Sequence, residues 1–268
     1  MLQIYNSLSR RKEVFRPRAG KTVKLYTCGP TVYSRPHIGN FRTYALEDTV
    51  KRYLLYLGFR VKHVMNITDF DSTVLREARK TGIPRKLLTK KFEKLFRQDV
   101  EKLGIIPAMQ YPHVSQYAEK MARRVKALLK NGFAYKEKDG RVFFDVSKYH
   151  SYGKLVGRDL SRSSSKVSLE EYKPFRAGDF LLWDPCTHQD LHDSFHTTLG
   201  VAHPAWNLQC AVMSTETLGG AIDLAMGGRD NLFNHHENTQ NGSKWKIVPE
   251  PLANTVNVYI EHHDHKKK

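Results

Sequence analysis

The sequence has few cysteines and no long apolar run. Its 268 residues include only three cysteines, with no close pairing among them. This excludes a disulfide-stapled scaffold and favours a reducing compartment. No apolar run approaches the roughly 20 residues that a membrane-spanning helix needs, and no signal peptide precedes the first predicted strand. We therefore expect a soluble, cytoplasmic protein with no membrane partner.

Acidic residues are scarce as well. The chain carries 44 Lys and Arg against 27 Asp and Glu, which gives a formal net charge of +17 and a pI of about 9.7. An excess of this size is typical of proteins that bind a polyanion, usually RNA or DNA. The alternative is a solvated basic surface with no specific partner, because much of the excess lies in helical stretches such as 85–94 and 123–130.

A β-rich run over residues 23–27 leads to the first chemically informative position. Gly29 and Pro30 stop this run, so Cys28 is expected at the carboxyl end of a buried strand. Open α/β sheets bind ligands at that edge. Cys28 is therefore a candidate ligand-binding residue, although a lone cysteine in a strand is more often a small buried hydrophobe.

A helix is predicted to follow this strand. Apolar residues recur at helical spacing over 41–57, and Asn40 is predicted as the N-cap. Residues 37–40 then lie in the turn that enters the helix. Backbone N–H groups and the helix dipole favour an anion there, and Gly39 lets a phosphate approach the backbone. The stretch therefore predicts a phosphate-binding site.

The rest of the pattern predicts an α/β fold. A second β-rich run over 59–67 completes a strand–helix–strand unit, whose two strand ends face one crevice. We expect residues 1–132 and 201–268 to form two halves of a nucleotide-binding domain, with an inserted α+β domain at 133–200. Further predicted elements are helices over 72–80, 84–103, 114–131 and 211–218, a hairpin over 134–146, a turn at 184–185 and a strand over 222–226.

Motifs along residues 2–240 occur in an order found in one known family. They are 26–33, 37–40, 66–69, 144–146, 152–155, 179–183, 206–213 and 235–238. In this combination the chain resembles cysteinyl-tRNA synthetase, a class I aminoacyl-tRNA synthetase. The resemblance implies a Rossmann-type parallel sheet with an inserted connective domain. It also implies activation of cysteine with ATP and Mg²⁺, followed by transfer of cysteine to tRNA.

The resemblance implies a zinc site that contacts the substrate thiolate. The protein ligands would be Cys28, Cys210 and His235. The family's fourth ligand is a glutamate, and this sequence leaves its replacement open among Thr239, His236 and Glu237. Zinc binds a thiolate far better than a neutral hydroxyl, so such a site rejects serine without an editing domain. A closed zinc site with no position for substrate is the alternative.

The resemblance also implies contacts with ATP and with the amino acid. The ATP-binding residues would be His37, Gly39, Asn40, Gly228 and Asp230. Among these, His37 and Asn40 would be catalytic, because they stabilise charge on the α-phosphorus during adenylate formation. The amino-acid pocket would include Gly29, Thr68 and Trp206. Ordinary packing of Trp206 and capping by Thr68 are the alternatives.

The sequence departs from the family pattern near the adenylate and at its end. Ala225 and Met226 stand where the family has a histidine and a glycine. The chain is expected to end before the family's Lys-Met-Ser-Lys-Ser loop and anticodon-binding region, with the lysines at 266–268 as crude substitutes. Three functions stay open: tRNA aminoacylation, ligation of cysteine to a small-molecule amine, and a non-catalytic paralogue or fragment that binds RNA or nucleotide.

Overall fold

The computed structural model describes residues 1–149, 152–155, 178–185, 193–228, 235–237 and 256–260. The chain divides into two compact units. The first comprises Met1–Ser115, Met213–Leu232 and Leu252–Lys268, and the second comprises Gln116–Val212 and Phe233–Pro251. The domain boundaries expected from the sequence, after residues 132 and 200, remain a prediction.

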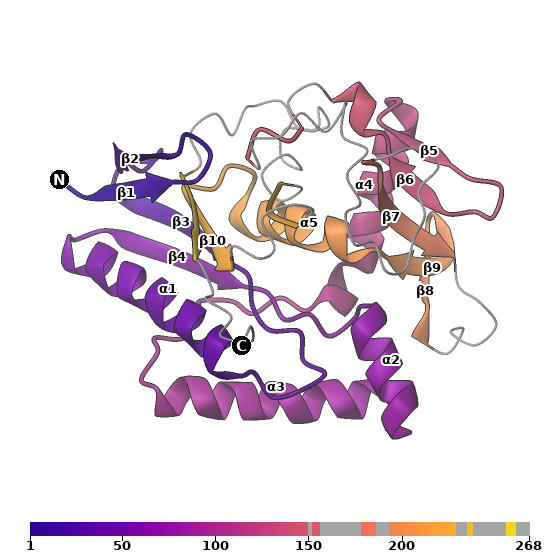
Figure 1. The fold of residues 1–268 in the computed structure, drawn as a ribbon, viewed down its shortest axis with the longest axis horizontal. Helices are drawn as coiled ribbons and strands as arrows, with labels where there is room; N and C mark the ends of the chain where they lie inside the picture. The colour runs from indigo at the N-terminus through magenta and orange to yellow at the C-terminus, as the bar shows by residue number, and fades with distance from the viewer. Residues whose placement is uncertain (150–151, 156–177, 186–192, 229–234, 238–255, 261–268) are drawn as a thin grey trace, which may run out of the picture. The chain divides into compact units, whose positions relative to one another are not determined.

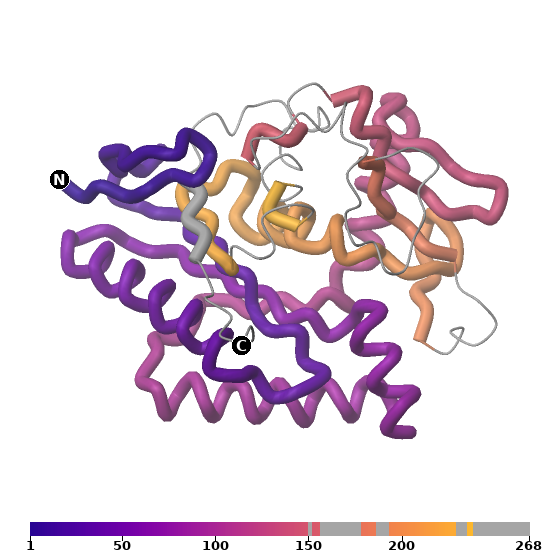
Figure 2. Tube along the Cα trace, in the orientation of Figure 1, coloured from indigo at the N-terminus to yellow at the C-terminus, as the bar shows by residue number. Residues whose placement is uncertain are grey.

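A parallel sheet organises the first unit (Figure 1). Its strands lie in the order β11-β10-β3-β4, and every neighbouring pair is parallel. The bounds are β3 (Thr22–Thr27), β4 (Arg60–Met65), β10 (Leu224–Gly228) and β11 (Val256–Ile260). The prediction of an α/β fold is therefore confirmed. Figure 2 shows β10 beside β3, although the paired residues Leu25 and Leu224 are 199 residues apart in sequence (224 − 25).

Helix α1 (Ile38–Tyr56) connects β3 to β4 and contacts β4 and β10. The prediction that Asn40 is its N-cap is wrong. His37 is the N-cap, and Asn40 occupies the third helical position, from which its side chain reaches back to the backbone of His37. The two side chains form a reciprocal capping box, which satisfies two backbone N–H groups that a bare helix end would leave without partners.

The buried face of α1 carries charge. It comprises Thr43, Tyr44, Glu47, Lys51 and Leu54. The apolar side chains of Leu46 and Tyr53 are instead exposed, at 42% and 46% of their full area. The spacing of apolar residues correctly predicted the helix. It could not identify the inner face, because two charged residues, Glu47 and Lys51, are buried there.

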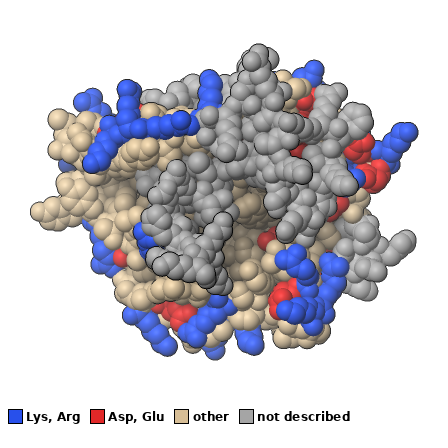
Figure 3. Space-filling model, in the orientation of Figure 1, with Lys and Arg blue, Asp and Glu red and all other residues tan. Residues whose placement is uncertain are grey.

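Two further helices and a hairpin also belong to the first unit. Helix α2 (Ser72–Thr81) begins at Asp71, whose side chain accepts a hydrogen bond from Val74 N at 2.6 Å. Helix α3 (Arg85–Lys102) follows it. Near the N-terminus, β1 (Gln3–Asn6) and β2 (Arg11–Val14) pair antiparallel. Figure 3 shows Lys and Arg side chains over this hairpin, where Arg10, Arg11 and Lys12 are exposed.

Two apolar clusters hold the first unit together. One joins β3, β10, α1 and the N-terminal hairpin, and comprises Ile4, Phe15, Val23, Leu25, Leu54, Leu224 and Met226. The other joins the end of β4 to α1 and α3, and comprises Val32, Tyr44, Met65, Ile67, Phe96, Val100 and Ala108. Burial of these side chains holds the carboxyl ends of β3 and β4 in fixed positions.

The second unit is built on an antiparallel sheet in the order β5-β6-β7-β9-β8. The strands are β5 (Ala134–Lys136), β6 (Val142–Phe144), β7 (Phe180–Pro185), β8 (Phe195–Thr197) and β9 (Gly200–Pro204). Pairing of β5 with β6 confirms the predicted hairpin, in which Gly140 has φ +92°. The predicted turn at 184–185 is wrong, because β7 continues through both residues to pair with β9.

Helical segments lie along this part of the chain. They are η1 (Val114–Tyr117), α4 (Ala118–Lys130), η2 (Val146–Lys148) and α5 (Trp206–Leu218). Among them, α4 contacts β5, β7, β8 and β9. Helix α5 begins five residues before the predicted start at 211, so Cys210 lies inside it. Within the described part of the chain, no helix combines the length and apolar character required to cross a bilayer.

Candidate active site

Cys28 follows the last residue of β3, at the carboxyl edge of the parallel sheet. Its backbone N donates a hydrogen bond to Met226 O at 3.2 Å, which continues the pairing of β3 with β10. The side chain is half-buried. The structure therefore confirms that Cys28 lies at the strand end, where ligands of open α/β sheets bind.

Gly29 and Thr68 lie together at the ends of β3 and β4. Thr68 N donates to Pro30 O at 3.0 Å, and Val32 N donates to Thr68 O at 3.1 Å. A Cβ atom on Gly29 would lie 1.8 Å from Asn66 O. Only glycine fits at such an approach, so the two strand ends are held at close range by backbone contacts.

The N-terminus of α1 brings His37, Gly39 and Asn40 together. His37 Nδ1 accepts a hydrogen bond from Gly39 N at 3.1 Å, and Asn40 Oδ1 accepts one from His37 N at 3.0 Å. Because Nδ1 accepts, the ring proton lies on Nε2, which becomes a donor on an exposed side chain. The geometry thus supplies a hydrogen-bond donor at a helix N-terminus, where anions are favoured.

A buried polar cluster that the sequence analysis missed lies beneath the end of β3. Lys51 Nζ donates to Pro107 O at 2.7 Å and contacts His63 Nδ1 at 3.4 Å. His63 Nε2 lies 2.9 Å from the Thr27 hydroxyl. Burial and then the charge of Lys51 lower the pKa of His63 to about 3. His63 is therefore neutral, and its Nε2–H donates to Thr27.

Glu47 belongs to the same cluster and is 1% exposed. Neither of its carboxyl oxygens has a hydrogen-bond partner among the described residues. Burial raises the pKa of this carboxyl well above its usual value. The spacing of Glu47 and Lys51 with Tyr44 and Leu54 is the signal that could have identified this buried stripe.

Three predicted site residues lie together in the second unit. His235 Nε2 is 2.9 Å from Cys210 Sγ, and the His235 ring stacks on the Trp206 ring with centroids 3.9 Å apart and planes at 19°. Cys210 and His235 are 2% and 3% exposed. Trp206 and Cys210 share one face of α5 because they are four residues apart. Cys210 Sγ and His235 Nε2 therefore belong to side chains that are buried from solvent and lie beside the Trp206 ring.

The chemistry of Cys210 and His235 fits a zinc ion. A thiolate and an imidazole are two of the ligands that zinc prefers, and a tetrahedral ion would keep their donor atoms about 3.5 Å apart. The observed 2.9 Å needs only a small separation of the two side chains. Cys28, the third predicted ligand, belongs to the other compact unit.

Of the three candidates for a fourth zinc ligand, Glu237 and His236 are described by the structure and differ in their contacts. Both carboxylate oxygens of Glu237 accept backbone hydrogen bonds at 3.0 Å, one from Gly153 N and one from Leu155 N. Glu237 thereby anchors residues 153–155 and also raises the pKa of Tyr149, after burial, to about 12. His236 is buried and contacts the His235 ring edge-on at 5.4 Å. Thr239 lies outside the described residues.

The nucleotide side of the predicted site is described only in part. Gly228 is the last residue of β10 and pairs with Ile260 of β11. Ala225 and Met226 are buried in the same strand, where Met226 joins the core. Asp230 lies outside the described residues. The replacements at 225 and 226 therefore add apolar packing within the sheet.

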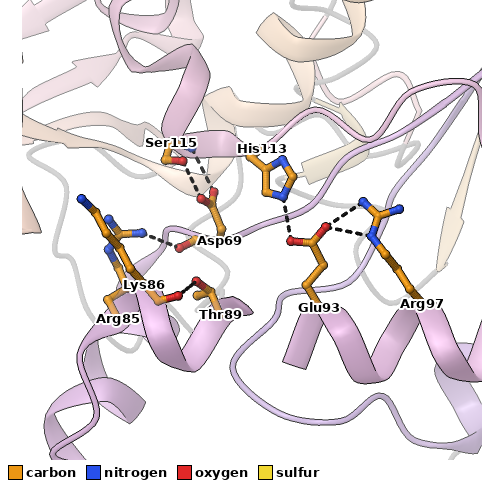
Figure 4. A network of polar contacts seen from close by, with 8 residues as sticks. All are labelled: Asp69, Arg85, Lys86, Thr89, Glu93, Arg97, His113 and Ser115. Carbon is orange, nitrogen blue, oxygen red and sulfur yellow. Dashed lines mark hydrogen bonds and ion pairs between the residues drawn. The ribbon is translucent and has the colours of Figure 1, made fainter. Parts of the chain in front are cut away.

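The motif over 66–69 is anchored to neighbouring elements by its last residue (Figure 4). The Asp69 carboxylate accepts hydrogen bonds from Ser115 N at 2.9 Å and Ser115 Oγ at 2.5 Å. Asp69 O accepts from Arg85 Nη1 at 3.0 Å. These contacts tie the residues after β4 to the start of α3 and to the start of η1.

The fold is similar to that of a solved synthetase. Methionyl-tRNA synthetase of Mycobacterium tuberculosis, solved with methionyl-adenylate, superposes on 90% of this chain and 57% of its own, with a TM-score of 0.58 at 11% identity. A likeness at that identity speaks for the fold alone. This fold is the Rossmann-type architecture of a class I synthetase.

Sequence comparison gives the family. The model of the "tRNA synthetases class I (C) catalytic domain" matches residues 14–264, and the chain belongs to that family. The cysteine–tRNA ligase of Chlamydia abortus is 44% identical over 240 residues, which are 88% of this chain and 50% of the relative. That of Methanosarcina mazei is 39% identical over 242 residues, 89% of this chain and 51% of the relative. The chain spans about half the length of these relatives.

Proposed function

We propose that the chain activates cysteine with ATP to form cysteinyl-adenylate and transfers the cysteine to tRNA(Cys). The observation that carries the proposal is the contact of Cys210 with His235 beside Trp206. These residues stand at positions that the family resemblance gives to metal and substrate. Membership in a class I synthetase family supports the same reaction.

Cysteine selection would rest on zinc held by Cys28, Cys210 and His235. Bound zinc supplies a thiolate-binding position, which serine cannot fill equally well. Among the alternatives for the fourth ligand, His236 is favoured over Glu237, because Glu237 already accepts two backbone hydrogen bonds. Trp206 would cover the amino acid, and Gly29 and Thr68 would hold it at the strand ends.

ATP would bind at the start of α1. The His37 Nε2–H would donate to a phosphate oxygen, and Asn40 would hold the His37 backbone in place, as its capping contact indicates. Gly228 and Asp230 would receive the adenosine, and Mg²⁺ would accompany the phosphates. Donors fixed before the reaction stabilise the charge that develops on the α-phosphorus.

The net charge of +17 supports tRNA as the acceptor. A cytoplasmic location forms part of the same proposal. Cysteine-dependent ATP–pyrophosphate exchange on this chain tests the activation step, with serine as the control amino acid. Exchange with cysteine alone supports the proposal. No exchange by a folded, zinc-loaded chain would contradict it and favour a non-catalytic paralogue.

Substitutions at His37 separate catalysis from helix capping. Because asparagine is a strong N-cap, His37→Asn should leave thermal stability near that of the unchanged chain. His37→Ala should lower the free energy of unfolding by about 1 kcal/mol. Loss of the Nε2–H donor should slow pyrophosphate exchange about 100- to 1,000-fold in both variants. Full exchange by His37→Asn would remove His37 from the reaction.

Metal analysis tests the zinc ligands. Cys28→Ala and Cys210→Ala should each lower zinc well below one ion per chain, measured by elemental analysis after dialysis against a weak chelator. Cys186→Ser is the matched control and should retain the unchanged stoichiometry, because the predicted ligand set leaves this third cysteine out. Full zinc content in the Cys28 and Cys210 variants would eliminate the proposed site.

A further inference from the structure

Asn66, to which the sequence analysis gave no role, connects the ends of β3 and β4 with its side chain. Its Oδ1 lies 3.1 Å from Gly29 N and 3.1 Å from the Tyr26 hydroxyl, and its Nδ2 lies 3.1 Å from Thr68 Oγ1. Asn66 is 2% exposed, and Tyr26 and Thr68 are 1% and 3% exposed. A single buried amide therefore contacts two residues of the proposed amino-acid pocket.

The peptide nitrogen of Gly29 fixes the orientation of this amide. A backbone N–H can only donate, so the Asn66 atom that faces it has to be the carbonyl oxygen. The amide nitrogen then faces Thr68 and donates to its hydroxyl oxygen. The direction of each hydrogen bond follows from one contact that permits no alternative.

This direction determines what the Thr68 hydroxyl can offer. The Thr68 backbone is held on both sides, by Pro30 O and by Val32 N. Its hydroxyl oxygen accepts from Asn66, so its own hydrogen is turned toward a different acceptor. A threonine prepared in this way is a donor with a fixed position and a fixed direction.

We infer that Asn66 is a positioning residue, which makes the Thr68 hydroxyl a hydrogen-bond donor to an acceptor atom of the bound amino acid. The inference rests on the proposed function, because it takes Thr68 as part of the amino-acid pocket. Asn66 acts through Thr68 and has no contact with the reacting atoms. Its contribution is to the affinity for the amino acid, and the affinity for ATP does not depend on it.

The substitution Asn66→Asp reverses one hydrogen bond and keeps the other two. An aspartate still accepts from Gly29 N and Tyr26, but it cannot donate to Thr68, whose hydrogen then turns inward. We expect about tenfold weaker binding of a non-hydrolysable cysteinyl-adenylate analogue and an unchanged affinity for ATP, both by calorimetry on the zinc-loaded chain. Thr68→Val should weaken binding of the analogue to a similar extent, because valine has no hydroxyl. Thr68→Ser keeps the hydroxyl and should bind the analogue as the unchanged chain does.

A double-mutant cycle distinguishes positioning from a general role in folding. If Asn66 acts through Thr68, adding Asn66→Asp to Thr68→Val causes no further loss of affinity. Tyr26→Phe is the matched control, because it removes one partner of Asn66 and leaves the contact with Thr68; its affinity should stay within twofold. Asn66→Ala completes the same cycle if the buried aspartate prevents folding, which thermal unfolding detects.

The outcomes separate this inference from the proposed function. If the unchanged chain fails to bind the analogue, the proposed function fails and the inference fails with it. If the unchanged chain binds and Asn66→Asp binds equally well, only the inference is overturned. Losses that add fully in the double variant also overturn it, because Asn66 would then act without Thr68.

Discussion

Gly29 is the residue at which the sheet edge tolerates least change. A Cβ there would lie 1.8 Å from Asn66 O and 2.8 Å from Met65 Cγ. The first of these neighbours is backbone, which cannot move aside as the end of a flexible side chain can. In the sequence, Gly29 is recognisable only as the stop of a strand and, from the family resemblance, as part of the amino-acid pocket. Its close approach to β4 depends on a contact between segments 37 residues apart.

Gly29→Ala should therefore destabilise the protein by about 3 kcal/mol, the upper range for an overpacked interior position. Gly82→Ala is the control, because a Cβ at Gly82 meets nothing within 4 Å and only its φ of +66° is unfavourable. That control should lose about 1 kcal/mol. Urea unfolding measures both values, and equal losses would show that Gly29 has room for a side chain.

Single residues also show where prediction from sequence stops. Cys28 was placed correctly because Gly29 and Pro30 limit the strand locally. The inner face of α1 was not, because Lys51 is buried by hydrogen-bond partners from β4 and residues 106–107, and Glu47 is buried on the same face. Hydrogen bonds between distant segments leave no local mark in the sequence.

At the scale of elements, a half-buried ion pair attaches α3 to the segment that follows it (Figure 4). His113 Nε2 lies 2.8 Å from Glu93 Oε2, and Arg97 donates to Glu93 Oε1 at 2.7 and 2.9 Å. The Arg97 guanidinium also lies 4.3 Å from the centre of the Tyr111 ring. Glu93 raises the pKa of His113, and His113 is the main cause that lowers the pKa of Glu93.

The pair makes stability depend on pH in a defined direction. A raised histidine pKa stabilises the fold below about pH 6.5, and this contribution is lost as pH rises through the folded-state value. A lowered glutamate pKa stabilises it above about pH 4.5. His113→Gln should therefore cost about 1 kcal/mol more at pH 5.5 than at pH 9, by urea unfolding. Equal costs at the two pH values would contradict the pairing.

At the scale of the whole molecule, the strand–helix–strand pattern was sufficient to predict the parallel sheet. Local signals gave β3, α1 and β4 with errors of a few residues at their ends, as expected for helices and strands that fray. Strand β11 and the β1–β2 hairpin were not predicted. Strand β11 pairs with β10 from beyond a long intervening segment, and the polar residues of β2 resemble a loop.

Charge is a property of the whole molecule, and it supports a salt-dependent affinity for tRNA. Six phosphate contacts would give a slope of about −5 in a plot of the logarithm of affinity against the logarithm of salt. We expect a slope steeper than about −3, measured by filter binding between 50 and 200 mM salt. A flat response from a chain that still activates cysteine would point to a small-molecule amine as the acceptor.

The central position of β3 has a consequence for the timing of folding. Leu25 of β3 pairs with Leu224 of β10, which is 199 residues later (224 − 25). At about 5–20 residues per second, a ribosome would release β10 roughly 10–40 s after β3. During that interval one edge of β3 has no strand to pair with, and it is open to association with other nascent chains. The order of synthesis thus sets when the sheet edge at Cys28 can first receive a ligand.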